Sequence, residues 1–234
     1  MSLKYKRVLL KLSGEALSAP DCILDGEFMT KVCSAIKDCA DMGAEIAIVI
    51  GGGNIWRGRQ GINIQRPRSD GMGMLATLIN SIAVQDTLIK CGLDTHVLSP
   101  LSVQRLAEDY SPQLAKDYLS GGSAVILSCG TGNPYFSTDT GAMLRALEIE
   151  ADIVLCAKNI DGVYDSDPKL NPNAKKYSSL SYNEVIEKDL KAIDGTAACM
   201  GGENGMKMLV FALKDPDNIR RALIGEDVGT VIHP

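Results

Sequence analysis

The chain has 234 residues, of which 45% are hydrophobic, 23% are charged and only 5% are aromatic, and its formal net charge is −5. A net negative chain with few aromatic side chains is poorly suited to stack bases or to bind a phosphate backbone, which argues against nucleic acid as a substrate. No apolar run approaches the roughly 20 residues of a membrane span, so we also expect no membrane partner.

Short apolar runs alternate with amphipathic segments along the chain. Apolar β-formers predict strands at residues 7–12, 45–50, 95–98, 124–128, 153–156 and 208–211. Apolar residues at helical spacing predict helices at residues 27–42, 72–91, 112–119, 140–149, 182–190 and 216–224. This alternation favours an α/β fold with a mostly parallel sheet that is covered on both faces. Ligands of such sheets bind beyond the carboxyl ends of the strands, so the loops there are the candidate sites.

The loop after the first strand begins with Lys11, Leu12, Ser13 and Gly14. Lys11 lies between two leucines near the end of a buried strand. It is either a lysine that reaches out to solvent from the strand end, or a positive charge directed at a phosphate. In the second case the backbone amides of Ser13 and Gly14 would assist it.

The loop after the second strand contains Gly51, Gly52, Gly53 and, four residues further on, Arg57. A flexible turn between a strand and a helix is the simple explanation. Three adjacent glycines are more than such a turn needs, and they cost backbone entropy. Close approach of the backbone to a ligand, beside the forked cation of Arg57, is the better explanation.

The third loop, residues 131–139, follows the strand at 124–128 and precedes a helix that either Ser137 or Thr138 caps. A helix amino terminus favours an anion. Asp139 in its first turn either caps the helix, orients a lysine or binds a magnesium ion. Together the three loops place glycines, hydroxyls, Lys11 and Arg57 at one edge of one sheet, as phosphoryl transfer requires.

Other sites have less support in the sequence. The pattern G-x-x-x-x-G-K-[ST] does not occur, and the glycines at 71–76 that resemble a dinucleotide fingerprint follow a charged segment, not a strand. The seven cysteines include no C-x-x-C pair. We therefore expect reduced, mostly core thiols in a cytoplasmic protein. His96 and His233 lie far apart in the sequence, which argues against a zinc site.

Several segments resemble the amino acid kinase superfamily and, within it, the bacterial uridylate kinases. They are residues 11–17 (KLSGEAL), 50–57 (IGGGNIWR), 70–77 (DGMGMLAT), 131–139 (TGNPYFSTD), 148–152 (EIEAD) and 161–168 (DGVYDSDP). The lysine and glycine segments alone fit several enzymes of the superfamily, whereas the first, third and fourth together are more specific. The resemblance covers nearly the whole chain.

The resemblance implies phosphorylation of UMP by ATP, with Mg²⁺ carried by ATP and not by a dedicated protein site. It implies one domain over residues 1–234, a three-layer αβα sandwich that assembles as a homohexamer in the cytoplasm. Residues 1–150 would serve mainly UMP and the phosphates, and residues 151–234 mainly the ATP nucleoside. It also implies GTP and UTP as effectors.

The resemblance further assigns residues to the two substrates. The ATP phosphates correspond to Lys11, Leu12, Ser13, Gly14, Gly53 and Arg57, and the ATP nucleoside to Lys158, Asn159, Tyr164 and Asp167. The UMP site corresponds to Gly52, Asp70, Thr131, Gly132, Asn133, Pro134, Tyr135, Phe136, Ser137 and Thr138. The catalytic residues would be Lys11, Arg57 and Asp139, and Asp194 resembles an acidic residue near the phosphates.

In the expected mechanism an oxygen of the UMP phosphate attacks ATP in line, and no general base is needed. Lys11 and Arg57 neutralise the transferred group, Asp139 holds Lys11, and Gly52 and Gly53 lie between the substrates where a side chain would block the attack.

Two segments depart from the family pattern. Residues 18–25 lack glycines that many family members have, and the loop between Arg57 and Asp70 is short. Both regions are tied to GTP activation in part of the family, so the responses to GTP and UTP stay open. Two other functions also stay open, namely a superfamily kinase for a carboxylate or carbamate and a non-catalytic nucleotide sensor.

Overall fold

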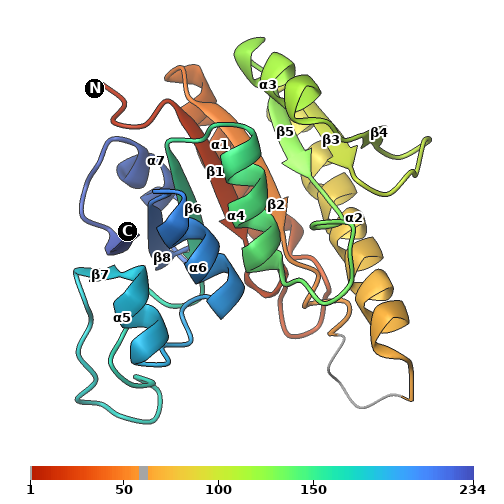
Figure 1. The fold of residues 1–234 in the computed structure, drawn as a ribbon. Helices are drawn as coiled ribbons and strands as arrows, with labels where there is room; N and C mark the ends of the chain where they lie inside the picture. The colour runs from red at the N-terminus through yellow and green to blue at the C-terminus, as the bar shows by residue number, and fades with distance from the viewer. Residues whose placement is uncertain (1, 58–62) are drawn as a thin grey trace.

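The computed structural model describes residues 2–57 and 63–234. Within these residues the strands form one sheet in the order β4-β3-β5-β2-β1-β6-β8-β9-β7 (Figure 1). Neighbouring strands are parallel except for β8 and β9. The strands are β1 (Arg7–Leu12), β2 (Glu45–Ile50), β3 (Thr95–Ser99), β4 (Glu108–Asp109), β5 (Ala124–Leu127), β6 (Ile153–Lys158), β7 (Ser179–Ser181), β8 (Met208–Ala212) and β9 (Gly229–His233).

Helices cover both faces of the sheet, which confirms the expected three-layer αβα sandwich. Helices α1, α2 and α7 share one hydrophobic core with alternate residues of β1, and α3 to α6 share the other core with Leu9. The alternation follows from the pleat of a strand, which sends successive side chains to opposite faces. The helices are η1 (Gly14–Leu17), α1 (Gly26–Asp41), α2 (Arg66–Lys90), α3 (Pro112–Ser120), α4 (Thr138–Glu148), α5 (Tyr182–Glu187), α6 (Gly195–Glu203) and α7 (Asn218–Leu223).

The six strands predicted from the sequence are present, but β4, β7 and β9 were missed. Strands β4 and β7 span only 2 and 3 residues, too few to show a period. Strand β9 begins with a glycine, which disfavours a strand in sequence terms. Here Gly229 is needed, because a Cβ at this position would lie 2.0 Å from the Val210 carbonyl oxygen across the pair.

Helix α2 begins at Arg66, whereas the sequence predicts a charged segment outside the helix at residues 66–70 and a helix only from residue 72. Pro67 fits the first turn of a helix, where its missing N–H costs nothing, and Arg66 Nε pairs with Asp70 Oδ2 at 2.8 Å one turn later. Against the sequence-based expectation, the helix is long and apolar enough to cross a membrane by those two criteria alone. Core helices also pass this test, and α2 packs Leu78, Val84 and Leu88 into the core beside α1.

Helix α6 explains the glycine-rich segment at residues 199–205, where no helix is predicted from the sequence. A Cβ at Gly201 would lie 2.6 Å from Cζ of the buried Tyr182 and 2.9 Å from Cε of Met143. Glycine therefore lets α6 approach α5 and α4 closely. Gly205 follows the helix with a φ of +72°, the left-handed conformation that favours glycine there.

Most cysteines are core residues, as expected. Cys33, Cys39, Cys129 and Cys156 are buried, whereas Cys22 and Cys199 are exposed and Cys91 is intermediate. Burial raises the pKa of both Cys33 and Cys39 to about 12, so these thiols stay neutral.

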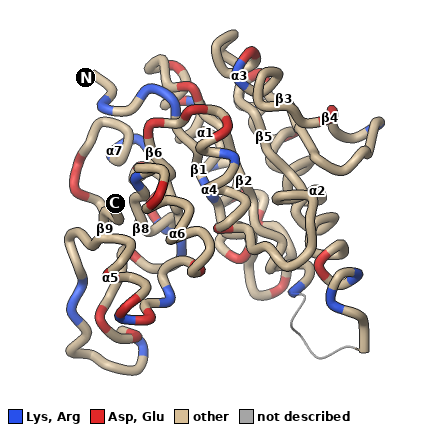
Figure 2. The backbone as a smooth tube through the Cα atoms, in the orientation of Figure 1, with Lys and Arg blue, Asp and Glu red and all other residues tan. Residues whose placement is uncertain are grey.

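Positive and negative residues are mixed along the chain. In the view of Figure 2, Lys and Arg positions are interspersed with Asp and Glu positions and form no continuous basic stripe.

Candidate active site

Two lysines share one carboxylate at the carboxyl ends of the two central strands. Lys11 of β1 lies 2.9 Å (Nζ to Oδ1) from Asp139, and Lys158 at the end of β6 lies 3.6 Å (Nζ to Oδ2) from it. Asp139 sits in the first turn of α4, whose amino terminus Ser137 caps by accepting a hydrogen bond from Thr140 N. The Lys11 and Asp139 side chains are only 11% and 17% exposed. This structure thus concentrates positive charge where β1, β6 and α4 meet.

The electrostatics of this cluster depend on its carboxylate. Burial lowers the pKa of Lys11, but the proximity of Cys156 and Asp139 raises it, and the net pKa lies above the ordinary lysine value. Burial also raises the pKa of Cys156, which makes that thiol neutral near pH 7. Asp139 is therefore the anion that keeps Lys11 charged. In turn, burial raises the pKa of Asp139, while Lys11 and Lys158 lower it below its usual range.

Packing requires glycine at positions 14 and 52. A Cβ at Gly14 would lie 2.4 Å from the Gly51 carbonyl oxygen, whereas a Cβ at Gly51 would lie 3.4 Å from the Gly14 nitrogen, an ordinary contact. A Cβ at Gly52 would lie 2.9 Å from both Gly73 O and Ala76 Cβ on α2. From the sequence, glycine is expected at position 52 because a side chain would block the attack of UMP on ATP. The clash with α2 is sufficient by itself to explain this glycine. Backbone contact between the two loops and α2 accounts for glycine there.

Asparagines that the sequence reasoning missed hold the glycine loop on α2. Asn80 is fully buried and donates to Gly51 O at 2.7 Å and to Asn54 Oδ1 at 2.8 Å. Asn54 in turn donates to Ile23 O at 2.8 Å. A polar residue in the middle of the apolar pattern of α2 was the available signal, because buried amides are kept for their hydrogen bonds.

Arg57 lies outside the lysine cluster in this structure. Its guanidinium is half-exposed, pairs with Glu15 and donates weakly through Nε to Gly53 O at 3.4 Å. Glu15 belongs to the first loop, so the pair joins the Lys11 loop to the glycine loop. No role for Glu15 is predicted from the sequence. Residues 58–62 belong to the short loop between Arg57 and Asp70 that is tied to GTP activation in part of the family. They lie outside the described residues.

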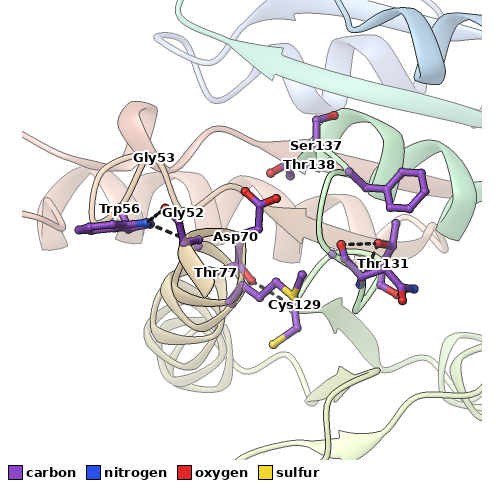
Figure 3. A pocket seen from close by; sticks show the side chains of 15 residues that line it. Gly52, Gly53, Trp56, Asp70, Thr77, Cys129, Thr131, Ser137 and Thr138 are labelled. Carbon is purple, nitrogen blue, oxygen red and sulfur yellow. Dashed lines mark hydrogen bonds between the residues drawn. The ribbon is translucent and has the colours of Figure 1, made fainter. Parts of the chain in front are cut away.

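A cavity of about 290 Å³ lies between α2, the glycine loop and the third loop (Figure 3). The carboxylate of Asp70 and the hydroxyl of Thr77 reach it from α2, and Trp56 lies at its glycine-loop side. Of the residues expected at the UMP site, seven line it: Gly52, Asp70, Thr131, Asn133, Phe136, Ser137 and Thr138. Gly53 lines it too, whereas Gly132, Pro134 and Tyr135 do not.

Two hydrogen bonds join α2 to the chain after β5, one to the third loop and one to the turn that precedes it. Asp70 Oδ2 accepts from the backbone nitrogen of Tyr135 at 2.8 Å, and Thr77 Oγ1 accepts from the backbone nitrogen of Cys129 at 2.8 Å. Trp56 Nε1 donates to Ser69 O at 3.0 Å, which ties the glycine loop to the same helix. Helix α2 therefore holds the segments on both sides of the cavity in place.

Asp194 has structural partners in this protein. It caps α6 by accepting from the backbone nitrogens of Thr196 and Ala197 at 3.0 and 3.1 Å. It also accepts hydrogen bonds from the hydroxyls of Ser137 and Thr140 at the start of α4. Its carboxylate therefore joins two helix amino termini beside the lysine cluster.

The residues expected near the ATP nucleoside separate into two groups. Lys158 directs its ammonium to Asp139 and to Ala192 O, so it belongs with Lys11 in the lysine cluster. Tyr164 and Asp167 lie on the loop that Asn159 begins after β6. Tyr164 donates to Asp161 Oδ1 at 2.8 Å, and Asp167 Oδ1 accepts from Lys169 N at 2.8 Å. Of the expected phosphate residues, Leu12 is buried at the end of β1 and Ser13 precedes η1.

Comparison with known proteins agrees with this geometry. The model of the "Amino acid kinase family" matches residues 6–213. The chain belongs to the amino acid kinase family. Within this family it is similar to the crystal structures of UMP kinase from Bacillus anthracis (36% identity, TM-score 0.94, 98% of this chain and 96% of that one) and from Ureaplasma parvum (36%, 0.93, 99% and 100%). It is less similar to uridylate kinase from Archaeoglobus fulgidus (27%, 0.75, 96% and 99%).

Proposed function

We propose that this chain is a UMP kinase that transfers the γ-phosphoryl group of ATP to UMP, giving ADP and UDP, in pyrimidine nucleotide synthesis. The observation that carries the proposal is the match at 36% identity, over almost the full length of both chains, to two bacterial UMP kinases. The geometry supports it, because a cavity lined by hydroxyls and glycine backbone lies next to the Lys11–Asp139–Lys158 cluster.

The acceptor nucleotide occupies the cavity beside α2. Thr131, Asn133 and Phe136 offer polar and aromatic groups to its base and sugar, and Asp70 offers a carboxylate to hydroxyls. Gly52, Gly53 and the amino terminus of α4 face its phosphate. The donor nucleotide lies across β1 and β6, with its nucleoside towards the loop that carries Asn159, Tyr164 and Asp167. A phosphate oxygen of UMP is already a nucleophile at neutral pH, so the transfer needs no general base.

Catalysis then consists of placing charge around the transferred group. Lys11 and Lys158 neutralise the negative charge that shifts onto the oxygens between donor and acceptor. Asp139 keeps Lys11 charged and holds both ammonium groups in place. Arg57 exchanges Glu15 for phosphate oxygens once the nucleotides are bound. The backbone amides of Ser13, Gly14 and Gly53 add further donors.

A divalent metal ion is general for kinases, and we assign Mg²⁺ carried by ATP. The donor set fits this assignment, because Asp139 is paired with two lysines and Asp194 already accepts bonds from two hydroxyls and two amides. In the described residues no cluster of three His, Cys, Asp or Glu side chains could hold an ion. When bound, Mg²⁺ would offset charge on the nucleotide phosphates. Lys11 and Lys158 would neutralise the remainder.

We also propose a cytoplasmic homohexamer. Helix α2 leaves Leu75, Ile79 and Ile89 about half exposed, as an interface between copies would require. GTP and UTP are the effectors to test. Size-exclusion chromatography with light scattering measures the assembly, and Ile79→Glu should reduce its mass while the monomer stays folded.

A coupled ADP-release assay with UMP, CMP, glutamate and carbamate, with and without GTP and UTP, tests the function. Turnover with UMP well above that with the other acceptors is expected. Turnover on glutamate or carbamate without turnover on UMP would assign the chain to another reaction of the family. Nucleotide binding without any turnover would make it a sensor.

A further inference from the structure

Arg145 on α4 is a buried cation that the proposed mechanism does not use. Its side chain is 6% exposed, and its guanidinium carbon lies 3.9 Å from the centre of the Tyr110 ring. Nη1 pairs with Glu148 Oε2 at 2.6 Å, and Nη2 donates to Gly130 O at 3.1 Å. Within the described residues, its buried Nε has no hydrogen-bond partner. Burying a cation with one donor unsatisfied costs free energy, so stability alone does not account for this arginine.

The carbonyl that Arg145 binds belongs to a strained turn. Cys129 and Gly130 both have a φ of 57°, in the left-handed region. For Cys129 this conformation is unfavourable and persists only where the surroundings fix it. The turn leads from β5 into the third loop, and both of its residues line the cavity. It is fixed by bonds from Cys129 N to Thr77, from Gly132 N to Cys129 O, and from Arg145 to Gly130 O.

Helix α4 is shaped to reach this turn. Gly141 lies one helical turn before Arg145, on the same face of α4. A Cβ at Gly141 would lie 3.3 Å from the Gly130 Cα, so the glycine lets the helix pack directly on the turn. Arg145 then spans the remaining distance to the carbonyl.

Glu148, the carboxylate that pairs with Arg145, is itself held by a second residue. Tyr110, just after β4, donates its hydroxyl proton to Glu148 Oε2 at 2.6 Å. Burial and the bond to Glu148 raise the pKa of Tyr110, which therefore stays a protonated donor across the physiological range. The ring of Tyr110 packs against the guanidinium and its hydroxyl holds the partner carboxylate. The orientation of Arg145 is thus set from two directions.

We propose that Arg145 is a positioning residue for the acceptor nucleotide. It does not line the cavity; it acts through Gly130 O, which fixes the turn from which the third loop departs. The inference rests on the proposed function, because it assigns that loop to UMP. It predicts that loss of the bond weakens UMP binding and leaves ATP binding unchanged.

The test compares Arg145→Lys with the matched control Arg7→Lys. Arg7 also pairs with a carboxylate (Glu45, 2.6 Å) and donates to a main-chain carbonyl (Ile149 O, 2.9 Å), but at the amino ends of the strands, away from the cavity. Lysine keeps the charge and loses the fork that reaches two acceptors at once. For Arg145→Lys we expect KM for UMP to rise about tenfold, with KM for ATP changed by less than about twofold. Arg7→Lys should lower Tm and leave both KM values unchanged.

Tyr110→Phe is the second variant and decides the matter if Arg145→Lys does not fold. It keeps the ring beneath the guanidinium and removes the bond to Glu148, so KM for UMP should rise by a smaller factor, about threefold. The fluorescence of Trp56, the single tryptophan, which lines the cavity, reports Kd for UMP independently of turnover.

The inference is wrong if folded Arg145→Lys, or Tyr110→Phe in its place, keeps the wild-type KM and Kd for UMP. It is also wrong if the variants change UMP and ATP parameters alike, since that indicates general destabilisation. Failure of the proposed function would appear earlier and separately, as a wild-type protein that does not phosphorylate UMP.

Discussion

Replacing Asp139 by asparagine should remove the charge balance of the Lys11–Asp139–Lys158 cluster. Asparagine keeps the shape but leaves the buried Lys11 and the partly buried Lys158 without the carboxylate that they share. At an effective dielectric constant of about 20, the lost attractions at 2.9 and 3.6 Å are about 6 and 5 kcal/mol. Relaxation and water reduce such values, and breaking a buried pair by removing one partner costs about 3–5 kcal/mol. We expect a loss of stability in that range near pH 7.

The same change should alter how stability depends on pH. In the wild type the raised pKa of Lys11 adds stability that is present below the ordinary lysine pKa and is lost as pH rises through the folded-state pKa. The lowered pKa of Asp139 adds stability that is lost as pH falls through its folded-state value. In Asp139→Asn, burial dominates and lowers the pKa of Lys11. Its unfolding free energy should therefore increase with pH on the approach to about 10.4.

Urea unfolding at a series of pH values, together with kcat at neutral pH, measures both effects. A displacement of Lys11 by about 1 Å is enough to reduce kcat about 100-fold. The control is Asp152→Asn, whose carboxylate accepts from Lys6 N and Arg7 N at the opposite edge of the sheet. If Asp139→Asn were as stable as Asp152→Asn and kept near-normal kcat, the charge balance described for this site would be refuted.

Three further substitutions test separate parts of the site. Lys11→Met should keep the circular dichroism spectrum and lose about 100-fold or more in kcat; near-normal turnover would remove Lys11 from catalysis. Gly52→Ala should lower stability by about 1–3 kcal/mol in thermal unfolding, because its Cβ meets α2. Gly71→Ala on the same helix, with nothing within 4 Å, should be neutral or stabilising, and equal effects of the two would contradict the packing argument. Asn80→Ala should cost about 1–3 kcal/mol by leaving Gly51 O unpaired, and an unchanged Tm would show that the carbonyl finds another partner.

The central strands could be predicted from the sequence because buried parallel strands are continuous apolar runs. The sequence also predicts that Lys11, the glycine loop and residues 131–139 lie together at the carboxyl ends of the strands, because the loops that follow parallel strands meet there. The ion pair of Lys11 with Asp139 is the contact expected from the sequence, while the catalytic roles stay predictions.

Other features depend on contacts between distant segments, which no local pattern contains. Asn80, Glu15 and Arg145 act through partners from other elements, and the charged first turn of α2 resembles a loop until Arg66 is seen to pair with Asp70. The contact of Lys158 with Asp139 likewise joins β6 to α4, while the expected role of Lys158 near the ATP nucleoside stays a prediction.

The backbone contact between Gly14 and Gly51 has a thermodynamic consequence. It joins the loop proposed for the donor phosphates to the loop proposed for the acceptor, with no flexible side chain between them. A ligand that shifts one loop must therefore do work on the other. Linkage requires this effect to be mutual, so ATP should change the affinity for UMP by the same factor as UMP changes the affinity for ATP. We therefore expect ATP and UMP to bind as coupled ligands. Titrating each nucleotide in the presence of the other measures the coupling free energy between their two sites.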